Sequence, residues 1–292
     1  MPFQIIINII VFASIYLLIG YSFSLVYNTS KFFNLSHAGF LVLAPYLLYL
    51  FYKILLIELT LSIIISVILI LIISHIVNNN VFVRLKARSS NTLILLISSL
   101  GLYIIIESLI SIFFGTEKKL LRSPEIKNIY EISNGFITLI NIFSVVSSIL
   151  LLTISSIIIG FSRFGLKIKS VINNESLAKI YGINIKKISN ISFVIGSGLV
   201  GLSGILVAFD TGMTPTMGFN LLLYGVVAMI IGGVGSTWGL VGGAILLATA
   251  QHLTAYYIDS KWMDAIAYII LILFLIWKPL GFSGKRLKKI EI

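Results

Sequence analysis

The sequence contains no cysteine and only three histidines. Without cysteine there is no disulfide, no thiolate nucleophile and no thiolate ligand for a metal ion. The histidines, His37, His75 and His252, are far apart in the sequence and show no spacing typical of metal ligands. We therefore expect no metal site in this chain.

Sequence signatures of enzymes are missing as well. No GxxxxGK[ST] phosphate-binding loop is present, so the chain does not energise itself with ATP by that route. HExxH, GxSxG and clusters of carboxylates are also absent. We therefore predict that the protein is not an enzyme and needs no cofactor of its own.

Charged residues are scarce, at 11% of the chain, whereas 58% of the residues are hydrophobic and the mean hydropathy is +1.09. This composition excludes a soluble globular protein. A membrane-crossing helix needs roughly 20 mostly apolar residues. Eight stretches fit that length: Phe3–Tyr27, Ala38–Leu56, Ile57–Val77, Asn91–Phe114, Ile137–Phe161, Ile191–Phe209, Gly239–Ile258 and Trp262–Trp277.

A ninth apolar stretch, Leu221–Ile231, is too short to cross a bilayer alone. The glycine-rich segment Ile230–Gly243 follows it, and glycine disfavours a continuous helix. Such a segment is either an interfacial loop or a re-entrant turn, and the shortness of Leu221–Ile231 favours re-entry. We predict an all-α polytopic protein, a single transmembrane domain over residues 1–292. It has about eight transmembrane helices plus a re-entrant or broken helix near residues 221–243.

Acidic residues are outnumbered by basic residues, 10 to 21, which gives a net charge of +11. Of the basic residues, 14 lie in three segments: three in Arg84–Arg88, six in Arg163–Asn190 and five in the C-terminal tail, 278–292. This pattern is typical of cytoplasmic loops that also attract anionic lipid, rather than of a nucleic-acid-binding surface. We therefore place the Arg163–Asn190 loop and the C-terminus in the cytoplasm, and the N-terminus and the Gly115–Gly135 loop outside.

Within the Arg163–Asn190 loop, the run from Glu175 to Gly182 has the pattern of a short amphipathic helix closed by a glycine. A basic, helix-forming loop between two membrane spans is suited to a cytoplasmic partner. We therefore expect this short helix to be a docking element.

Several polar residues lie where apolar residues are expected. Glu107 falls well inside Asn91–Phe114, and an ionisable residue at that depth is a functional candidate. It either binds a substrate ammonium group or hydrogen-bonds a neighbouring helix. Asn34, Ser36 and His37 suit either a polar pocket wall or a helix start with Ser36 as the N-cap. Gly232, Gly233 and Gly235 complete the candidate translocation path.

Three groups of motifs occur in the order found in one family of membrane proteins. The first is Gly20–Tyr27 followed by Asn34-Leu-Ser-His-Ala-Gly39. The second is Asn174–Asn184 leading into Phe193–Gly204. The third is Gly232-Gly-Val-Gly-Ser-Thr-Trp-Gly239 with Gly242 and Gly243, and then Trp277-Lys-Pro-Leu-Gly281. Together they resemble the LivH-like permease subunits of branched-chain amino acid ABC importers. Phe40 stands where that family has a glutamate, and Ala38 where it has a glycine.

The resemblance implies an importer of the prokaryotic inner membrane. It would combine two ABC ATPase subunits that bind ATP, a second permease subunit (another copy or a paralogue) and an extracytoplasmic solute-binding protein. The cytoplasmic loop would dock into the ATPase through Glu175, Ala178, Gly182, Ile183 and Asn184. Related permeases import urea, short amides, or sugars and nucleosides on a similar plan. An ATP-independent carrier or channel, and a membrane scaffold, are alternatives from other classes.

Overall fold

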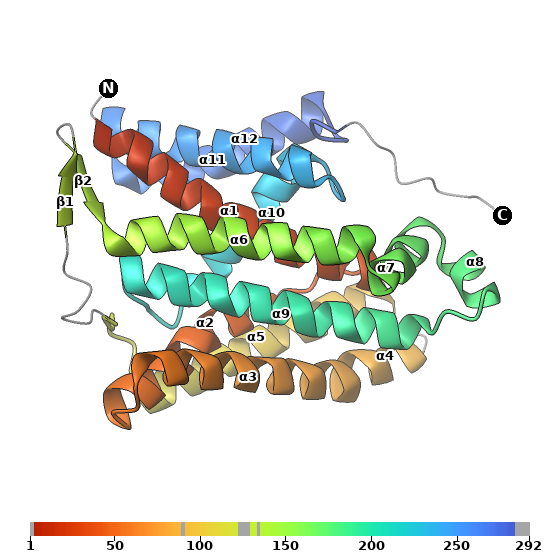
Figure 1. Cartoon of the computed structure of the whole chain (residues 1–292). Helices are drawn as coiled ribbons and strands as arrows, with labels where there is room; N and C mark the ends of the chain where they lie inside the picture. Colours follow the sequence, from red (N-terminus) through yellow and green to blue (C-terminus); the bar gives the residue numbers. More distant parts are fainter. Residues whose placement is uncertain (1–2, 89–90, 122–128, 133–134, 284–292) are drawn as a thin grey trace.

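The computed structural model describes residues 3–88, 91–121, 129–132 and 135–283. The predicted all-α fold is confirmed: the helices lie side by side in a bundle, and the described strands are two short ones at one end (Figure 1). The helices are α1 Phe3–Ser30, α2 Ser36–Tyr49, α3 Leu59–Val77, α4 Val83–Ala87, α5 Thr92–Phe114, α6 Leu139–Phe161, α7 Arg163–Asn173, α8 Glu175–Ile180, α9 Ile185–Asp210, α10 Met217–Gly232, α11 Thr237–Tyr257 and α12 Met263–Trp277. The strands β1 (Ile129–Ile132) and β2 (Gly135–Thr138) pair antiparallel.

In the described part of the chain, seven helices are long and apolar enough to cross a membrane. Each corresponds to one of the predicted spans, although the third runs on from Leu59 to Ala87. The eighth predicted span, Gly239–Ile258, forms the 21-residue helix α11. Its glycines and polar side chains keep its hydropathy below that of the other seven.

The predicted interruption of the apolar run separates α10 from α11. Helix α10 has 16 residues and is therefore about 24 Å long, less than the roughly 30 Å of a bilayer core. It packs against α11, and the turn between them lies at the same end of the bundle as α7 and α8 (Figure 1). The segment before α10 lies at the other end, where Lys119 and Met213 exchange backbone hydrogen bonds of 2.9 Å.

Helix α1 is the centre of the bundle and packs against α6, α9, α10 and α11. Small residues permit this close packing, because lipid gives apolar helices no hydrophobic reason to associate. A Cβ atom built on Gly20 would lie 2.6 Å from the Gly225 carbonyl oxygen of α10. A Cβ atom on Gly204 of α9 would collide with the Leu41 carbonyl oxygen of α2.

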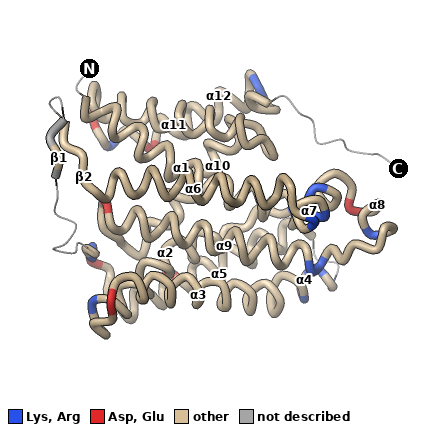
Figure 2. The backbone as a smooth tube through the Cα atoms, viewed as in Figure 1, with Lys and Arg blue, Asp and Glu red and all other residues tan. Residues whose placement is uncertain are grey.

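Charged residues gather at the two ends of the bundle (Figure 2). Basic residues are prominent on α4, α7 and α8, whereas the opposite end carries both signs. Two segments with predicted locations are only partly described. Arg122, Glu125 and Lys127 of the Gly115–Gly135 loop and the tail 284–292 lie outside the described residues.

Candidate functional site

The short helix predicted in the Arg163–Asn190 loop is present as α8, and both of its ends are capped. At its start, the Asn174 side-chain oxygen accepts a 3.0 Å hydrogen bond from the Leu177 N–H. At its end, the Gly182 N–H donates to the Lys179 carbonyl and the Ile183 N–H donates to the Ala178 carbonyl, both at 3.0 Å. This is a Schellman motif, which needs the left-handed backbone that Gly182 adopts at φ +75°.

One face of α8 is held against the bundle. Ala178 is 3% exposed and belongs to a small apolar cluster with Leu25 of α1, Ile168 and Val171 of α7, and Ile188 of α9. Ile183 packs against the same cluster, and Asn184 caps α9 by accepting a 3.0 Å hydrogen bond from the Lys187 N–H. These residues of the predicted docking element therefore hold α8 in place on the bundle.

The other face of α8 is apolar and exposed. Leu177, Ile180 and Tyr181 are 50%, 78% and 83% exposed. None of the three was predicted as a coupling residue from the sequence. The signal was nevertheless present, because large apolar side chains on a basic, water-facing helix are unusual outside interfaces.

The glycine-rich turn after α10 has backbone conformations that favour glycine. Gly233 and Gly235 have φ angles of +95° and +88°. Ser236 then caps α11 by accepting a 3.1 Å hydrogen bond from the Gly239 N–H. The segment after α12 joins this turn, because the Phe282 N–H donates to the Ile231 carbonyl at 2.9 Å. Gly232 and Gly233 are therefore buried, whereas Gly235 and Trp238 further along the segment are exposed.

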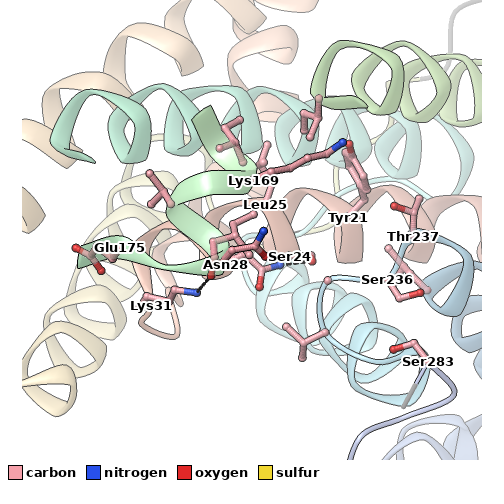
Figure 3. A pocket seen from close by; sticks show the side chains of 18 of the residues that line it. Tyr21, Ser24, Leu25, Asn28, Lys31, Lys169, Glu175, Ser236, Thr237 and Ser283 are labelled. Atoms are coloured by element: carbon pink, nitrogen blue, oxygen red, sulfur yellow. Dashed lines mark hydrogen bonds between the residues drawn. The ribbon is translucent and has the colours of Figure 1, made fainter. Parts of the chain in front are cut away.

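A cavity of about 930 Å³ lies between this turn and the α7–α8 region, and we call it the inner cavity. Helix α1 forms one wall, with Tyr21, Ser24 and Asn28 (Figure 3). Glu175 and Gly235 both line it, so the structure brings together one predicted coupling residue and one predicted path residue. The lining also includes residues that were not predicted as site residues from the sequence: Lys31, Lys169, Ser236, Thr237 and Ser283 (Figure 3).

The polar groups of the inner cavity connect α1 to α7. The Lys31 ammonium donates a 3.3 Å hydrogen bond to the Ile172 carbonyl. Burial lowers the pKa of Lys31, and the Glu175 carboxylate partly offsets this change. The Asn28 amide donates to the Ser24 hydroxyl at 3.0 Å, whereas its buried side-chain oxygen has no partner among the described residues. This oxygen is therefore a buried, unpaired acceptor in the wall of the cavity.

Asn34, Ser36 and His37 lie elsewhere, buried inside the bundle at 1%, 0% and 0% exposure. The prediction that Ser36 is the N-cap of α2 is wrong: the cap position is Leu35, and Ser36 is already helical. The Asn34 side-chain oxygen instead accepts from the Ser36 N–H at 3.1 Å and from the Ser36 hydroxyl at 2.7 Å. The Ala38 N–H, which a capping Ser36 could have served, donates instead to the Leu35 carbonyl at 3.0 Å.

His37 is enclosed by aromatic rings. The ring centroids of Phe193, Phe40 and Phe23 lie 5.8, 6.2 and 6.3 Å from that of His37. Neither His37 ring nitrogen has a hydrogen-bond partner in the part of the chain that the structure describes. The same part contains no group of three His, Cys, Asp or Glu residues placed to hold a metal ion.

A second cavity, of about 720 Å³, lies at the opposite end of the bundle, and we call it the outer cavity. Its walls come from α1, α5 and α10, and its lining includes Tyr103, Asn220 and Tyr224. Glu107 lies one turn beyond Tyr103 on α5. The Tyr224 hydroxyl donates to the carboxylate of Asp264 on α12. Asp264 was not predicted, although a carboxylate in the first turn of an apolar helix was a visible signal.

Comparison with known proteins places the chain in a family. A sequence model described as "Branched-chain amino acid transport system / permease component" matches residues 5–275. The high-affinity branched-chain amino acid transport system permease protein LivH of Salmonella typhimurium is 27% identical over 203 residues, covering 68% of this chain and 66% of LivH. The high-affinity branched-chain amino acid transport system permease protein BraD of Pseudomonas aeruginosa is 27% identical over 203 residues, covering 68% of this chain and 66% of BraD.

The match therefore spans slightly less than two thirds of the length of these relatives. A chain in the solved structure of PsaBC from Streptococcus pneumoniae in complex with Fab has a TM-score of 0.49 and 12% identity, covering 97% of this chain and 94% of that one. The family model covers almost the whole sequence. The protein is a multi-pass membrane protein that belongs to the branched-chain amino acid transport permease family.

Proposed function

We propose that this chain is the membrane permease subunit of an ATP-driven importer of branched-chain amino acids in a prokaryotic inner membrane. The family match over residues 5–275 and the names of the relatives LivH and BraD support this proposal. In the proposed assembly, two ATPase subunits bind and hydrolyse ATP, and an extracytoplasmic solute-binding protein delivers the solute. A second permease subunit, either another copy of this chain or a paralogue, completes the translocation path.

The proposed orientation places α7 and α8 in the cytoplasm. Their end of the bundle carries the basic residues of α4, α7 and α8 (Figure 2). Basic loops are retained on the cytoplasmic side during insertion, so this distribution supports the assignment. The outer cavity would then open towards the solute-binding protein.

Helix α8 is the observation that carries the coupling part of the proposal. Ala178 holds it against the bundle, while Leu177, Ile180 and Tyr181 face outwards. An apolar face on a short, capped helix suits insertion into a groove of a partner protein. We infer that the ATPase subunit provides that groove.

The inner cavity suggests how movement of α8 would reach the translocation path. Glu175 at the start of α8 and Gly235 in the glycine-rich turn line the same space. The hydrogen bond from Lys31 to Ile172 connects the end of α1 to α7, which directly precedes α8. Displacement of α8 by the closing ATPase subunits would therefore change the shape of the inner cavity.

Replacement of Ile180 by aspartate tests this proposal. The charge would stand where an apolar contact with the ATPase is expected, and burying it without a partner costs several kcal/mol. We expect solute-stimulated ATP hydrolysis by the reconstituted complex to be lost, while the variant chain keeps its thermal stability because Ile180 is 78% exposed. Phe136→Ser, at a 57% exposed position on β2 at the other end of the molecule, is the matched control and should hydrolyse ATP normally. Normal stimulation with Ile180→Asp would refute docking through α8.

A further inference from the structure

The outer cavity combines three kinds of lining. Apolar side chains from several elements form most of it: Phe12, Leu100, Val207, Met217, Phe219 and Leu221. Threonine hydroxyls from Thr211, Thr214 and Thr216 and the amide of Asn220 contribute polar groups. Among the described residues of the lining, Lys118 is the one basic side chain. A volume of about 720 Å³ is in the range of small-molecule sites.

Two tyrosines make parts of this lining rich in hydrogen-bond acceptors. Tyr224 and Tyr103 both line the cavity, and the Tyr224 hydroxyl donates its proton to the Asp264 carboxylate. A tyrosine hydroxyl that donates in this way presents its oxygen as an acceptor. The adjacent carboxylate adds negative charge, so this part of the cavity suits a cation with N–H donors.

The Tyr224 ring packs against the buried ring of Tyr16. Its centroid lies 5.4 Å from that of Tyr16, which is 1% exposed. With its hydroxyl bound to Asp264 and its ring packed on Tyr16, Tyr224 has a fixed orientation. A fixed ring and hydroxyl reduce the entropy lost when a ligand binds.

Lys118 adds a positively charged group to the lining of the outer cavity. Its stem lies against Gly212, where a built Cβ atom would come within 2.9 Å of the Lys118 Cε atom. The neighbouring Lys119 is fixed by its two backbone hydrogen bonds to Met213. The cavity lining therefore combines a cationic group on a braced loop, acceptor oxygens on α5 and α10, and apolar side chains.

We propose that the outer cavity binds one zwitterionic amino acid with an aliphatic side chain. Lys118 contacts the ligand's carboxylate, Tyr224 contacts its ammonium group, and the apolar lining holds its side chain. Asp264 is a positioning residue that acts through Tyr224. The assignment rests on the proposed transport function, to which it adds a binding site.

Three probes that differ by one charged group test the site. L-Leucine carries both charges, 3-methylbutylamine lacks the carboxylate, and 4-methylpentanoate lacks the ammonium group. Their binding is measured by saturation-transfer NMR on the full chain in lipid nanodiscs. We expect leucine to bind about tenfold or more tightly than either analogue, because each charged hydrogen bond adds that much affinity. Equal binding of the three probes would overturn the proposal.

Two variants then test which residue contacts each charged group of the ligand. Tyr224→Phe should weaken leucine and 3-methylbutylamine binding about tenfold and leave 4-methylpentanoate unchanged. Lys118→Gln should weaken leucine and 4-methylpentanoate binding and leave 3-methylbutylamine unchanged. Tyr268→Phe is the matched control, since Tyr268 lies one turn from Asp264 on α12 but outside the cavity lining. A variant that fails to fold would lose all three probes equally, and the comparison of probes on the unaltered chain then decides.

Measurement of leucine uptake by the complete complex distinguishes an error in the proposed binding site from an error in the proposed transport function. ATP-driven leucine uptake with equal binding of the three probes would overturn the site and support the proposed function. Discrimination among the probes without ATP-driven leucine uptake would support the site and overturn the function.

Discussion

Gly182 ends α8 through its backbone conformation, whereas Asn174 begins the helix through its side chain. The φ angle of Gly182 is +75°, in the left-handed region that costs other L-residues roughly 1–2 kcal/mol. A Cβ atom at this position would meet nothing within 4 Å. The requirement for glycine is therefore conformational and is separable from packing.

Replacing Gly182 by alanine should weaken coupling without unfolding the protein. A cost of about 1 kcal/mol reduces the ratio of the capped to the frayed helix roughly fivefold. We expect solute-stimulated ATP hydrolysis by the assembled complex to fall, by up to about fivefold. Gly182→Asn should retain more activity, since asparagine tolerates the left-handed conformation better. Equal activity of the two variants would show that the φ angle of Gly182 does not limit coupling.

Residue types alone predicted some of these local structures and missed others. The glycine that closes α8 was predictable, because the pattern from Glu175 to Gly182 lies within a few residues of sequence. The role of Ser36 was predicted wrongly, because α2 has Leu35 at its cap position and the Asn34 side chain accepts from the Ser36 N–H and hydroxyl. Partners distant in sequence, such as Tyr224 and Asp264, leave no local pattern from which to predict their contact.

Helices α10 and α11 form a hairpin whose close packing depends on glycine. A Cβ atom on Gly243 would collide with the Ala228 carbonyl oxygen of α10. The adjacent Gly242 points elsewhere, and its Cβ atom would meet only Phe282, at 3.8 Å and 4.0 Å. Two neighbouring glycines in one helix thus have different roles.

Alanine at these two positions should therefore have opposite effects on stability. Gly243→Ala forces the two helices apart and should cost about 1–3 kcal/mol, as overpacking of a core usually does. Gly242→Ala should be neutral or gain roughly 0.5–1 kcal/mol from the higher helix propensity of alanine. The thermal midpoint of the detergent-solubilised chain measures both effects. A lower midpoint for Gly242→Ala than for Gly243→Ala would contradict this account of the hairpin.

Hydropathy predicted the elements better than their arrangement. Segment length and apolar content are local properties, so the spans and the break near Gly233 were predictable. The exposed apolar face of α8 and the cavity lined by both Glu175 and Gly235 depend on which side of each helix packs against the bundle. That choice is made by tertiary contacts such as those of Ala178 and Leu25.

At the scale of the whole molecule, both cavities are lined by α1. Phe12 lines the outer cavity, whereas Tyr21 and Ser24 line the inner cavity. Between these residues α1 meets α10 at Gly20 and Gly225, where a Cβ atom on Gly20 would lie 2.6 Å from the opposing carbonyl oxygen. A contact this close leaves no room for a solute between the two glycines.

The orientation of the molecule is testable by cysteine labelling, because the natural chain contains no cysteine that would react. Thr116 and Ser170 are exposed at opposite ends of the bundle, and Ser197 is completely buried. We expect Thr116→Cys to react with a membrane-impermeant maleimide on intact spheroplasts, since the basic end of the chain is retained in the cytoplasm. Ser170→Cys should react only after permeabilisation, and Ser197→Cys should stay unlabelled until the protein is denatured. Labelling of Ser170→Cys but not of Thr116→Cys on intact spheroplasts would reverse the orientation. The α8 face would then lie on the wrong side of the membrane to meet an ATPase.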